Sequence, residues 1–315
     1  MGDPHSRSEP KPTLQDRIEY LFIRAVGFLM AVLPRSFALG FARSLGIFAY
    51  DVLRIRRRVT LENLARAFPQ KSPLERRRIG RAAFINLAIV GMEMLRASRL
   101  TREKVLSLVQ VDEESESLYH RLMKESKGVV FISGHYSTWE FLGARIAATG
   151  YPTLIIVQDQ RNPLVNKELM RARKRLELLL AGRGQAVRNV LRTLREGGTV
   201  ALLADQDAGP KSGLFIDFFG EPASTYQGPA AFAIRSGAPL LACWIHREGL
   251  SYRAGYERLD EDALAGLPVD ADEEVRVWRL TEAYVRWLEE RIRMDPDQYL
   301  WLHRRWKSRP ERETE

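Results

Sequence analysis

Cysteine is almost absent from this chain of 315 residues: Cys243 is the only one, so no intramolecular disulfide can form. It lies in an apolar run, which favours a buried, unreactive thiol. The five histidines are scattered at positions 5, 120, 135, 246 and 303, and no Cys/His cluster has the spacing of a zinc site. We therefore expect neither a disulfide framework nor a bound metal.

The chain also lacks a long uncharged apolar run. Residues 20–33 are apolar but number only 14 and include Arg24, whereas about 20 residues are needed to span a bilayer. No small-residue cleavage site follows them, which argues against a signal peptide. Together with residues 37–53 they form either a pair of core helices or an anchor lying in the membrane interface beside the basic run 54–58. We favour the anchor.

Acidic residues are outnumbered by basic ones, which gives a formal net charge of +9. This balance favours polyanionic partners, such as anionic lipid, phosphorylated ligands, an acidic carrier protein or nucleic acid. The sequence contains no zinc finger, no RNA-recognition aromatic pattern and no basic zipper, so we expect no nucleic-acid partner.

Apolar periodicity predicts an α/β fold with a central, mostly parallel sheet flanked by helices. We expect a disordered tail over residues 1–13, a membrane-anchoring helical segment over 14–58, and a single α/β domain over 59–310. Residues 59–126 have helical spacing. Strands are predicted at 128–133, 153–158, 199–204, 214–218, 239–246 and 251–257, and helices at 138–148, 163–181, 187–196, 227–236 and 271–293.

The most informative stretch of the chain surrounds His135. A buried strand is predicted to end just before Ser133-Gly134, so His135 lies at the carboxyl end of a strand, where open α/β sheets bind ligands. With His135 in the turn and Glu140 in the first helical turn, the two side chains can meet as a base and the acid that orients it. The alternative is structural: Ser137-x-x-Glu140 also fits a capping box.

Three other constellations follow predicted strands. The first contains Arg161, the helix start Asn162-Pro163 and, two turns later, Arg171. The second is Asp205-x-Asp207, at a strand end, where the carboxylates either belong to a site or shape the turn. The third is the predicted helix start near residue 228, whose free amides suit a phosphate or carboxylate, although a plain turn and cap fits equally well.

Taken together, these motifs resemble the lysophospholipid acyltransferase superfamily, and within it the late acyltransferases of lipid A biosynthesis. The resemblance covers residues 15–310. The residues that carry it are His135-x4-Glu140, Asn162-Pro163 with Arg171, Asp205-x-Asp207-x-Gly209-Pro210, Phe218-Phe219-Gly220 with Thr225, the Arg-rich stretch 57–68 and the ending Pro296-x-Gln298-Tyr299-x-Trp301-x-His303-Arg304-Arg305-Trp306-Lys307. The ending is the most specific of these motifs.

The resemblance implies a bacterial inner-membrane enzyme, on the cytoplasmic face, that transfers an acyl chain from acyl carrier protein or coenzyme A to a glycolipid hydroxyl, with no other cofactor. It implies that His135 is the general base and that Glu140 orients it. Gly134 amides, Arg161 and Arg171 would hold an anionic group or the oxyanion, and Asp205 and Asp207 would position Arg171 or the acceptor. No Gly-x-Ser-x-Gly elbow is present, so direct transfer is expected.

The sequence departs from the lipid A enzymes at one motif, because a single Asn precedes Pro163 where they often have two. Two alternatives therefore stay open. The acceptor is another glycolipid or lysophospholipid, such as mannosylated phosphatidylinositol, or the chain is a non-catalytic lipid-binding protein. The sequence specifies neither the length of the acyl chain nor the hydroxyl that receives it.

Overall fold

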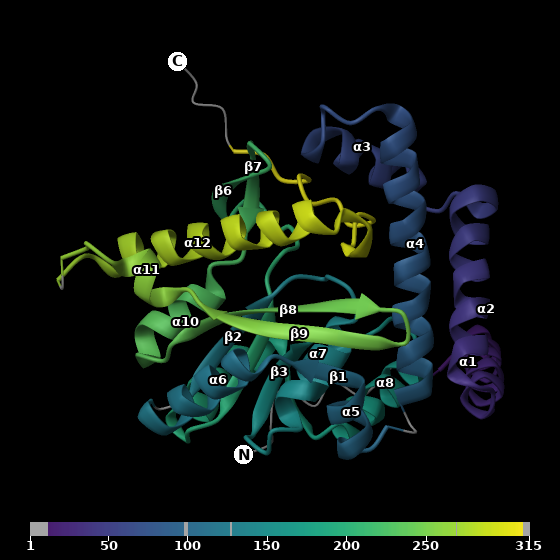
Figure 1. Cartoon of the computed structure of the whole chain (residues 1–315), viewed down its shortest axis with the longest axis horizontal. Coiled ribbons are helices and arrows are strands. Elements are labelled where there is room, and N and C mark those ends of the chain that lie inside the picture. The colour runs from purple at the N-terminus through teal and green to yellow at the C-terminus, as the bar shows by residue number, and fades with distance from the viewer. Residues whose placement is uncertain (1–11, 98–99, 127, 269, 311–315) are drawn as a thin grey trace.

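The computed structural model describes residues 12–97, 100–126, 128–268 and 270–310, in which helices cover both faces of a seven-stranded sheet (Figure 1). The strands have the order β1-β9-β8-β2-β5-β3-β4. Their bounds are Val109–Val111 (β1), Val129–Ser133 (β2), Thr153–Val157 (β3), Leu178–Gly182 (β4), Thr199–Leu203 (β5), Leu240–Glu248 (β8) and Ser251–Arg258 (β9).

All neighbouring strands of this sheet run parallel except β8 and β9, which are antiparallel. Every residue of the central strand β2 is buried. Val130 and Ile132 enter one core, whereas Val129 and Phe131 enter the core on the opposite face. Burial on both faces explains why this strand is a continuous apolar run rather than an alternating one. The predicted fold class is confirmed.

Helices α6 and α7 supply the core on one face of the sheet, and α9, α10 and α12 supply it on the other. A separate antiparallel hairpin, β6 (Leu214–Phe218) and β7 (Glu221–Thr225), packs near α12. The helices are α3 (Arg57–Ala67), α4 (Pro73–Arg96), α5 (Arg102–Leu108), α6 (Glu113–Glu125), α7 (Trp139–Ala147), α8 (Pro163–Arg175), α9 (Ala186–Arg195), α10 (Gly228–Ser236), α11 (Asp260–Leu264) and α12 (Glu273–Met294).

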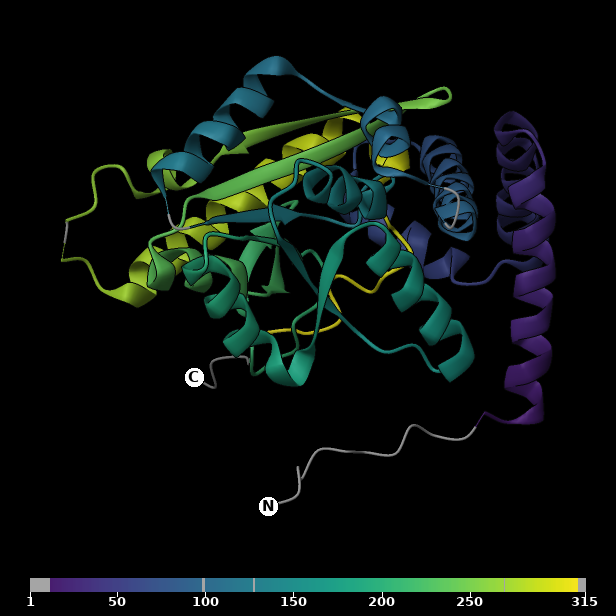
Figure 2. The ribbon, with the colours of Figure 1, turned by 90° about the horizontal axis from the view of Figure 1, so that it is seen from below.

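Two N-terminal helices, α1 (Leu14–Val32) and α2 (Arg35–Phe48), lie together at one side of the molecule and pack against α4 (Figures 1 and 2). A capping box formed by Thr13 and Asp16 begins α1. Gly46 allows close packing, because a Cβ there would lie 2.5 Å from Ile85 Cα. The continuation of α2 is a π-helical turn, Ala49–Leu53.

The outer surface of α1 and α2 is apolar and exposed. Its exposed side chains include Ile18, Leu21, Phe22, Phe28, Phe37, Phe41 and Phe48. By length and composition alone, Arg35–Leu53 is also the one candidate for a membrane span among the described residues. A large apolar surface of this kind marks an interaction with a membrane or a partner. An ordinary surface helix would instead present a polar outer face.

The sequence misplaced several element boundaries. Helix α8 ends at Arg175, and the predicted helical residues 178–181 belong to strand β4. The helix breaks because Glu177 adopts a left-handed φ of 62°. The short strands β1 and β7 were not predicted. Most of the predicted disordered tail, residues 1–11, lies outside the described residues.

Candidate active site

The turn after β2 presents His135 at the carboxyl edge of the sheet. Gly134 precedes it where space is tight, because a Cβ there would lie 2.9 Å from Leu288 Cδ1. The C-terminal segment, residues 296–310, holds the turn in place. The Leu300 N–H donates to the His135 carbonyl (3.0 Å), and the Ser137 N–H donates to the Gln298 carbonyl (2.7 Å). The motif that ends the chain thus packs directly on the histidine loop.

Asp205 is the carboxylate that orients His135. Its Oδ1 lies 2.7 Å from His135 Nδ1, and its Oδ2 accepts the His135 backbone N–H at 2.9 Å. Although 70 residues separate them, the two meet because β2 and β5 are parallel neighbours that end together, with Ser133 beside Leu203. The Asp205 side chain is only 2% exposed. A bidentate contact with a buried carboxylate fixes both the ring and its backbone.

Charge and burial act in opposite directions on His135. Burial disfavours the imidazolium, but the charge and hydrogen bond of Asp205 outweigh it with help from the Glu140 charge, so the pKa of His135 is raised. Burial likewise opposes ionisation of Asp205, yet the contacts with His135 prevail and lower the pKa of that carboxyl. The pair therefore favours an ionised aspartate beside a more basic histidine.

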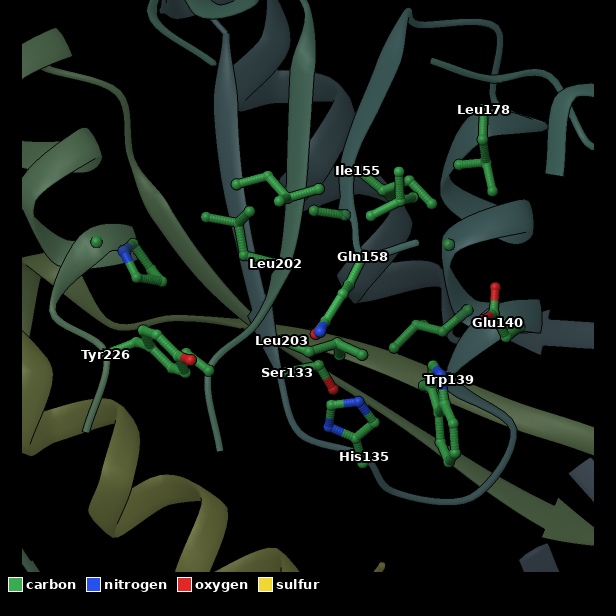
Figure 3. A pocket seen from close by; sticks show the side chains of 18 of the residues that line it. Ser133, His135, Trp139, Glu140, Ile155, Gln158, Leu178, Leu202, Leu203 and Tyr226 are labelled. Carbon is green, nitrogen blue, oxygen red and sulfur yellow. The ribbon is translucent and has the colours of Figure 1, made fainter. Parts of the chain in front are cut away.

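The second ring nitrogen of His135 faces the other way. With a proton on Nδ1 donated to Asp205, Nε2 is the ring nitrogen that accepts, and its polar neighbour among the described residues is the Gln206 side-chain amide, which can donate a long hydrogen bond to it. Gln206 Nε2 lies 3.4 Å from His135 Nε2, and Trp139 meets the ring edge-on with the ring centres 4.9 Å apart. Figure 3 shows the ring at one end of a cavity, with Trp139 at its side. His135 Nε2 is thus placed to accept a proton from a bound molecule.

The structure corrects the expectation that Glu140 orients His135. Glu140 instead forms a two-pronged ion pair with Arg173, in which Arg173 Nε lies 3.2 Å and Nη2 2.5 Å from its carboxylate oxygens. The capping box does not form either: Thr138 is the N-cap of α7, and Ser137 has a left-handed φ of 48°. Glu140 therefore reaches His135 only through its charge.

Arg161 and Arg171, both expected at the site, lie outside the cavity. Arg171 pairs with Glu168 at 2.6 Å and is 52% exposed, and Arg161 is also exposed. The Asn162 side chain caps α8 and donates to Asp16 and Glu19 on α1, so this motif joins α8 to the N-terminal helix. The arginine that does line the cavity is Arg173.

Asp207 lies beside the site and contacts the C-terminal segment, not Arg171 as one of its expected roles required. Its carboxylate accepts hydrogen bonds from the Ser308 backbone and hydroxyl, and its own N–H donates to His303 Nε2 at 3.2 Å. Burial lowers the pKa of His303, which suits a neutral acceptor. These contacts fasten the C-terminal segment to the loop after β5.

The cavity next to His135 has a volume of about 500 Å³ and runs from the histidine along the sheet. Its walls are largely apolar, with polar groups gathered near His135 (Figure 3). Apolar lining residues include Leu142, Ile146, Ile155, Leu178, Leu202 and Phe232. The start of α10, at Gly228 and Pro229, also borders it. A cavity with apolar side chains along its wall and a histidine at one end suits a substrate that has an apolar chain.

Among the residues that the structure describes, no group of three or more His, Cys, Asp or Glu side chains is arranged to hold a metal ion. The one cysteine, Cys243, borders the cavity but is buried, and burial raises the pKa of its thiol well above the usual range. Such a thiol stays protonated and is a poor nucleophile. Cys243 is therefore not a candidate nucleophile in this cavity.

Comparison with known proteins identifies the family. A family model described as bacterial lipid A biosynthesis acyltransferase matches residues 10–308. The chain belongs to this family. It is 28% identical over 268 residues to the lipid A biosynthesis palmitoleoyltransferase of Escherichia coli (strain K12), covering 84% of this chain and 83% of the relative. It is 26% identical over 294 residues to the lipid A biosynthesis lauroyltransferase of the same strain, covering 90% of each chain. A lipid A biosynthesis acyltransferase of Haemophilus influenzae is 26% identical over 276 residues, covering 82% of this chain and 80% of the relative.

This protein is therefore an acyltransferase, and the structure shows which site residues its sequence did not reveal. Trp139, Arg173 and Gln206 line the cavity beside His135, but none was predicted to do so. Arg171, Arg173 and Arg175 alternate along one helix, so periodicity alone could not choose the one that faces the cavity. Asp205 was expected at the site as a residue that positions Arg171 or the acceptor, whereas the structure shows it bound to His135. A signal for this pairing was present, since both residues follow predicted parallel strands.

Proposed function

We propose that this acyltransferase moves a fatty acyl chain from a thioester of acyl carrier protein or coenzyme A to a hydroxyl of a lipid A precursor. The observation that carries the proposal is His135, whose Nδ1 is bound to buried Asp205 and whose Nε2 opens on an apolar cavity. The cavity suits the acyl chain, and the base suits the activation of a hydroxyl. Membership of the lipid A family supports the choice of acceptor.

The reaction proceeds by direct transfer. His135 Nε2 removes the proton of the acceptor hydroxyl as the oxygen attacks the thioester carbonyl carbon. The resulting intermediate collapses, the carbon–sulfur bond breaks, and the leaving thiolate takes the proton back from His135. General-base assistance of this kind typically contributes about 10²–10⁴ in rate. The raised pKa of His135 makes it a stronger base.

Asp205 is a positioning residue in this scheme. It holds the proton of His135 on Nδ1 and stabilises the imidazolium that forms as the hydroxyl loses its proton. The developing oxyanion needs fixed N–H donors, and one good donor contributes roughly 3–4 kcal/mol. Arg173 adds a cation to the cavity, and the Gln206 side-chain amide lies next to the base. The backbone N–H groups of His135 and Ser137, which follow Gly134, are already bonded to Asp205 and to the Gln298 carbonyl, so they are not free to act as these donors. Glu140 keeps Arg173 in place and contributes its charge.

We place the reaction at the cytoplasmic face of the bacterial inner membrane. The exposed apolar surface of α1 and α2 supports this, because it would let the enzyme rest on the membrane that holds a lipid acceptor. The net charge of +9 suits both anionic lipid and an acidic carrier protein. No cofactor enters the scheme beyond the thioester co-substrate.

A transfer assay tests the proposal. Purified enzyme in detergent is mixed with a radiolabelled acyl-carrier-protein or coenzyme A thioester and, separately, with a lipid A precursor, a lysophospholipid or a mannosylated phosphatidylinositol. We expect label only on the lipid A precursor, and a loss of about 10²–10⁴ in rate in His135→Ala. His120→Ala is the matched control, since His120 lies on α6, outside the cavity, and should transfer normally.

Label on a different acceptor would be consistent with general-base transfer by His135 but would overturn the proposal that the acceptor is a lipid A precursor. No label with either donor would overturn enzymatic transfer in favour of lipid binding alone. Normal transfer by His135→Ala would contradict the proposal that His135 is the general base.

A further inference from the structure

A second cavity, of about 400 Å³, lies between α3 and the C-terminal segment and shares no lining residue with the His135 cavity. Four cationic side chains line it: Arg58 and Arg66 from α3, and Arg304 and Lys307 from the chain end. One carboxylate, Glu62, lies among them. The proposed acyl transfer makes no use of this cavity. It is therefore a strongly basic pocket without an assigned role.

Three hydrogen bonds tie the two walls of this cavity together. Asn63 Nδ2 donates to the carbonyls of Trp301 (2.8 Å) and His303 (2.6 Å), and Arg56 Nη1 donates to the Leu302 carbonyl (3.1 Å). Asn63 is buried, so its two bonds are largely shielded from water, whereas the Arg56 bond is exposed. These hydrogen bonds hold α3 against the C-terminal segment, so the cationic side chains are positioned before any ligand binds. Preformed sites bind with a smaller entropic cost.

The charges in the cavity are only partly balanced. Arg58 pairs with Glu62 at 2.7 Å, but the two side chains are 91% and 55% exposed, and an exposed pair of this kind is weak. Arg66 pairs with Glu221, which does not line the cavity. Arg304 and Lys307 are exposed, and neither forms an ion pair within the described part of the chain. An anion that carries more than one negative charge would balance this excess positive charge.

The cavity lies where the apolar N-terminal surface joins the rest of the molecule. Val52, Leu53 and Ile55, all exposed, come just before α3, which begins at Arg57. Figure 1 shows α3 and the C-terminal segment on the same side of the molecule as the upper end of α2. The exposed residues Val52, Leu53 and Ile55 thus connect α3, one wall of the cavity, to the apolar surface that we propose rests on the membrane. The volume of the cavity also exceeds what a bare phosphate needs.

We propose that this cavity binds the phosphate group of a membrane-lipid headgroup. An arginine guanidinium can donate two parallel hydrogen bonds to two phosphate oxygens, and a lysine ammonium adds a further positive charge. A phosphomonoester carries between one and two negative charges near neutral pH, which suits four cations opposed by one carboxylate. The site is separate from His135, so this proposal stands whether or not the proposed acyl acceptor is correct.

Calorimetry on the full chain in nonionic detergent tests the proposal with short-chain phosphatidic acid as the probe. We expect Arg304→Gln/Lys307→Gln to weaken its binding at least ~10-fold, because two charge-assisted contacts are lost. The matched control is Arg121→Gln/Lys124→Gln on α6, which removes an exposed Arg and Lys at the same spacing and should bind as the wild type does. Circular dichroism checks that both variants are folded.

Two further ligands separate the possible sources of the phosphate. Short-chain phosphatidylcholine, which lacks the phosphomonoester, should bind at least ~10-fold more weakly than phosphatidic acid. Inorganic phosphate should also bind more weakly, because it lacks the rest of the headgroup. Equal affinity for inorganic phosphate would overturn the lipid source and indicate a free-anion site. Equal losses in the cavity variant and the α6 variant would overturn the site altogether.

Discussion

The two ring nitrogens of His135 have different partners, and this difference organises the site at the scale of single residues. Nδ1 is held by Asp205, whereas Nε2 faces the cavity beside Gln206. Glu140, the acid nearest in sequence, is occupied by Arg173. Both carboxylates raise the pKa of His135, but only Asp205 also bonds to it. The two acids can therefore be told apart by their effects on the pH profile.

We predict that the acid limb of kcat/KM lies above the ordinary histidine pKa of about 6.5. A general base with a raised pKa stays protonated to a higher pH, so activity is lost as the pH falls through that value. Asp205→Asn removes the main cause of the raised pKa. It should move the acid limb to lower pH and, by disturbing the tautomer, reduce kcat by up to about 10⁴. Glu140→Gln should shift the limb in the same direction but less.

The measurement is kcat/KM against pH for the wild type and both variants. Glu140→Gln leaves Arg173 unpaired and largely buried, so thermal unfolding must confirm that it is folded at the assay temperature. An acid limb that moves more in Glu140→Gln than in Asp205→Asn would restore Glu140 as the acid that orients the base.

At the scale of elements, helix α7 joins the reactive end of the cavity to its apolar end. Its first residues, Trp139 and Glu140, lie beside His135, whereas Gly143 and Ile146 lie farther along the cavity wall. A Cβ on Gly143 would lie 3.9 Å from Leu178 Cδ2, an ordinary contact. Leu178 lies at the end of the cavity away from His135 (Figure 3). In the proposed reaction, the far end of the acyl chain would occupy the part of the cavity beside Gly143.

We predict that Gly143→Leu shifts acyl preference toward shorter donors. The new side chain fills the far end of the cavity, and each methylene excluded from an apolar pocket changes discrimination by about 1–3 kcal/mol. The ratio of kcat/KM for a donor two carbons shorter should rise at least ~10-fold, measured with a series of acyl thioesters. Gly143→Ala is the control, because a single methyl fits and should leave preference unchanged. An unchanged preference in Gly143→Leu would place the acyl chain elsewhere.

At the scale of the whole molecule, the N-terminal helices stand apart from the sheet (Figure 2). Phe22 and Phe28 on α1 are 69% and 72% exposed, which is a large apolar surface to leave in water. The same helix is joined to α8 through Asn162 and through Tyr20, whose hydroxyl donates to Glu168. A membrane contact at this surface would therefore fix the orientation of the catalytic part.

We predict that Phe22→Glu/Phe28→Glu lowers binding to anionic vesicles at least ~10-fold without unfolding the chain. Burying one such side chain contributes roughly 1.5–3 kcal/mol, and a carboxylate reverses the gain. Vesicle flotation measures the effect. Val275→Glu/Trp278→Glu is the matched control, since these two exposed residues lie on α12, away from α1. If the control lost binding equally, charge rather than the apolar surface would explain the result.

The sequence determined what depends on nearest neighbours along the chain. Burial on both faces makes a parallel strand a continuous apolar run, so β2 and β5 were predictable, and the strand ends marked His135 and Asp205. Capping chemistry likewise marked the start of α8 at Asn162-Pro163. The family motifs, in order, pointed to an acyltransferase. Each of these signals lies within about ten residues, where local conformation decides.

Only the tertiary structure decided which of these residues touch. It chose Asp205 over Glu140 as the partner of His135, because strand neighbours in a sheet need not be neighbours in sequence. It also placed Arg173, and not Arg171, in the cavity wall, because the packing of α8 against α1 and β4 fixes which face of the helix points into the cavity. It also brought the chain end onto α3 and the histidine loop. Such contacts depend on packing between segments far apart in sequence, which local spacing does not encode.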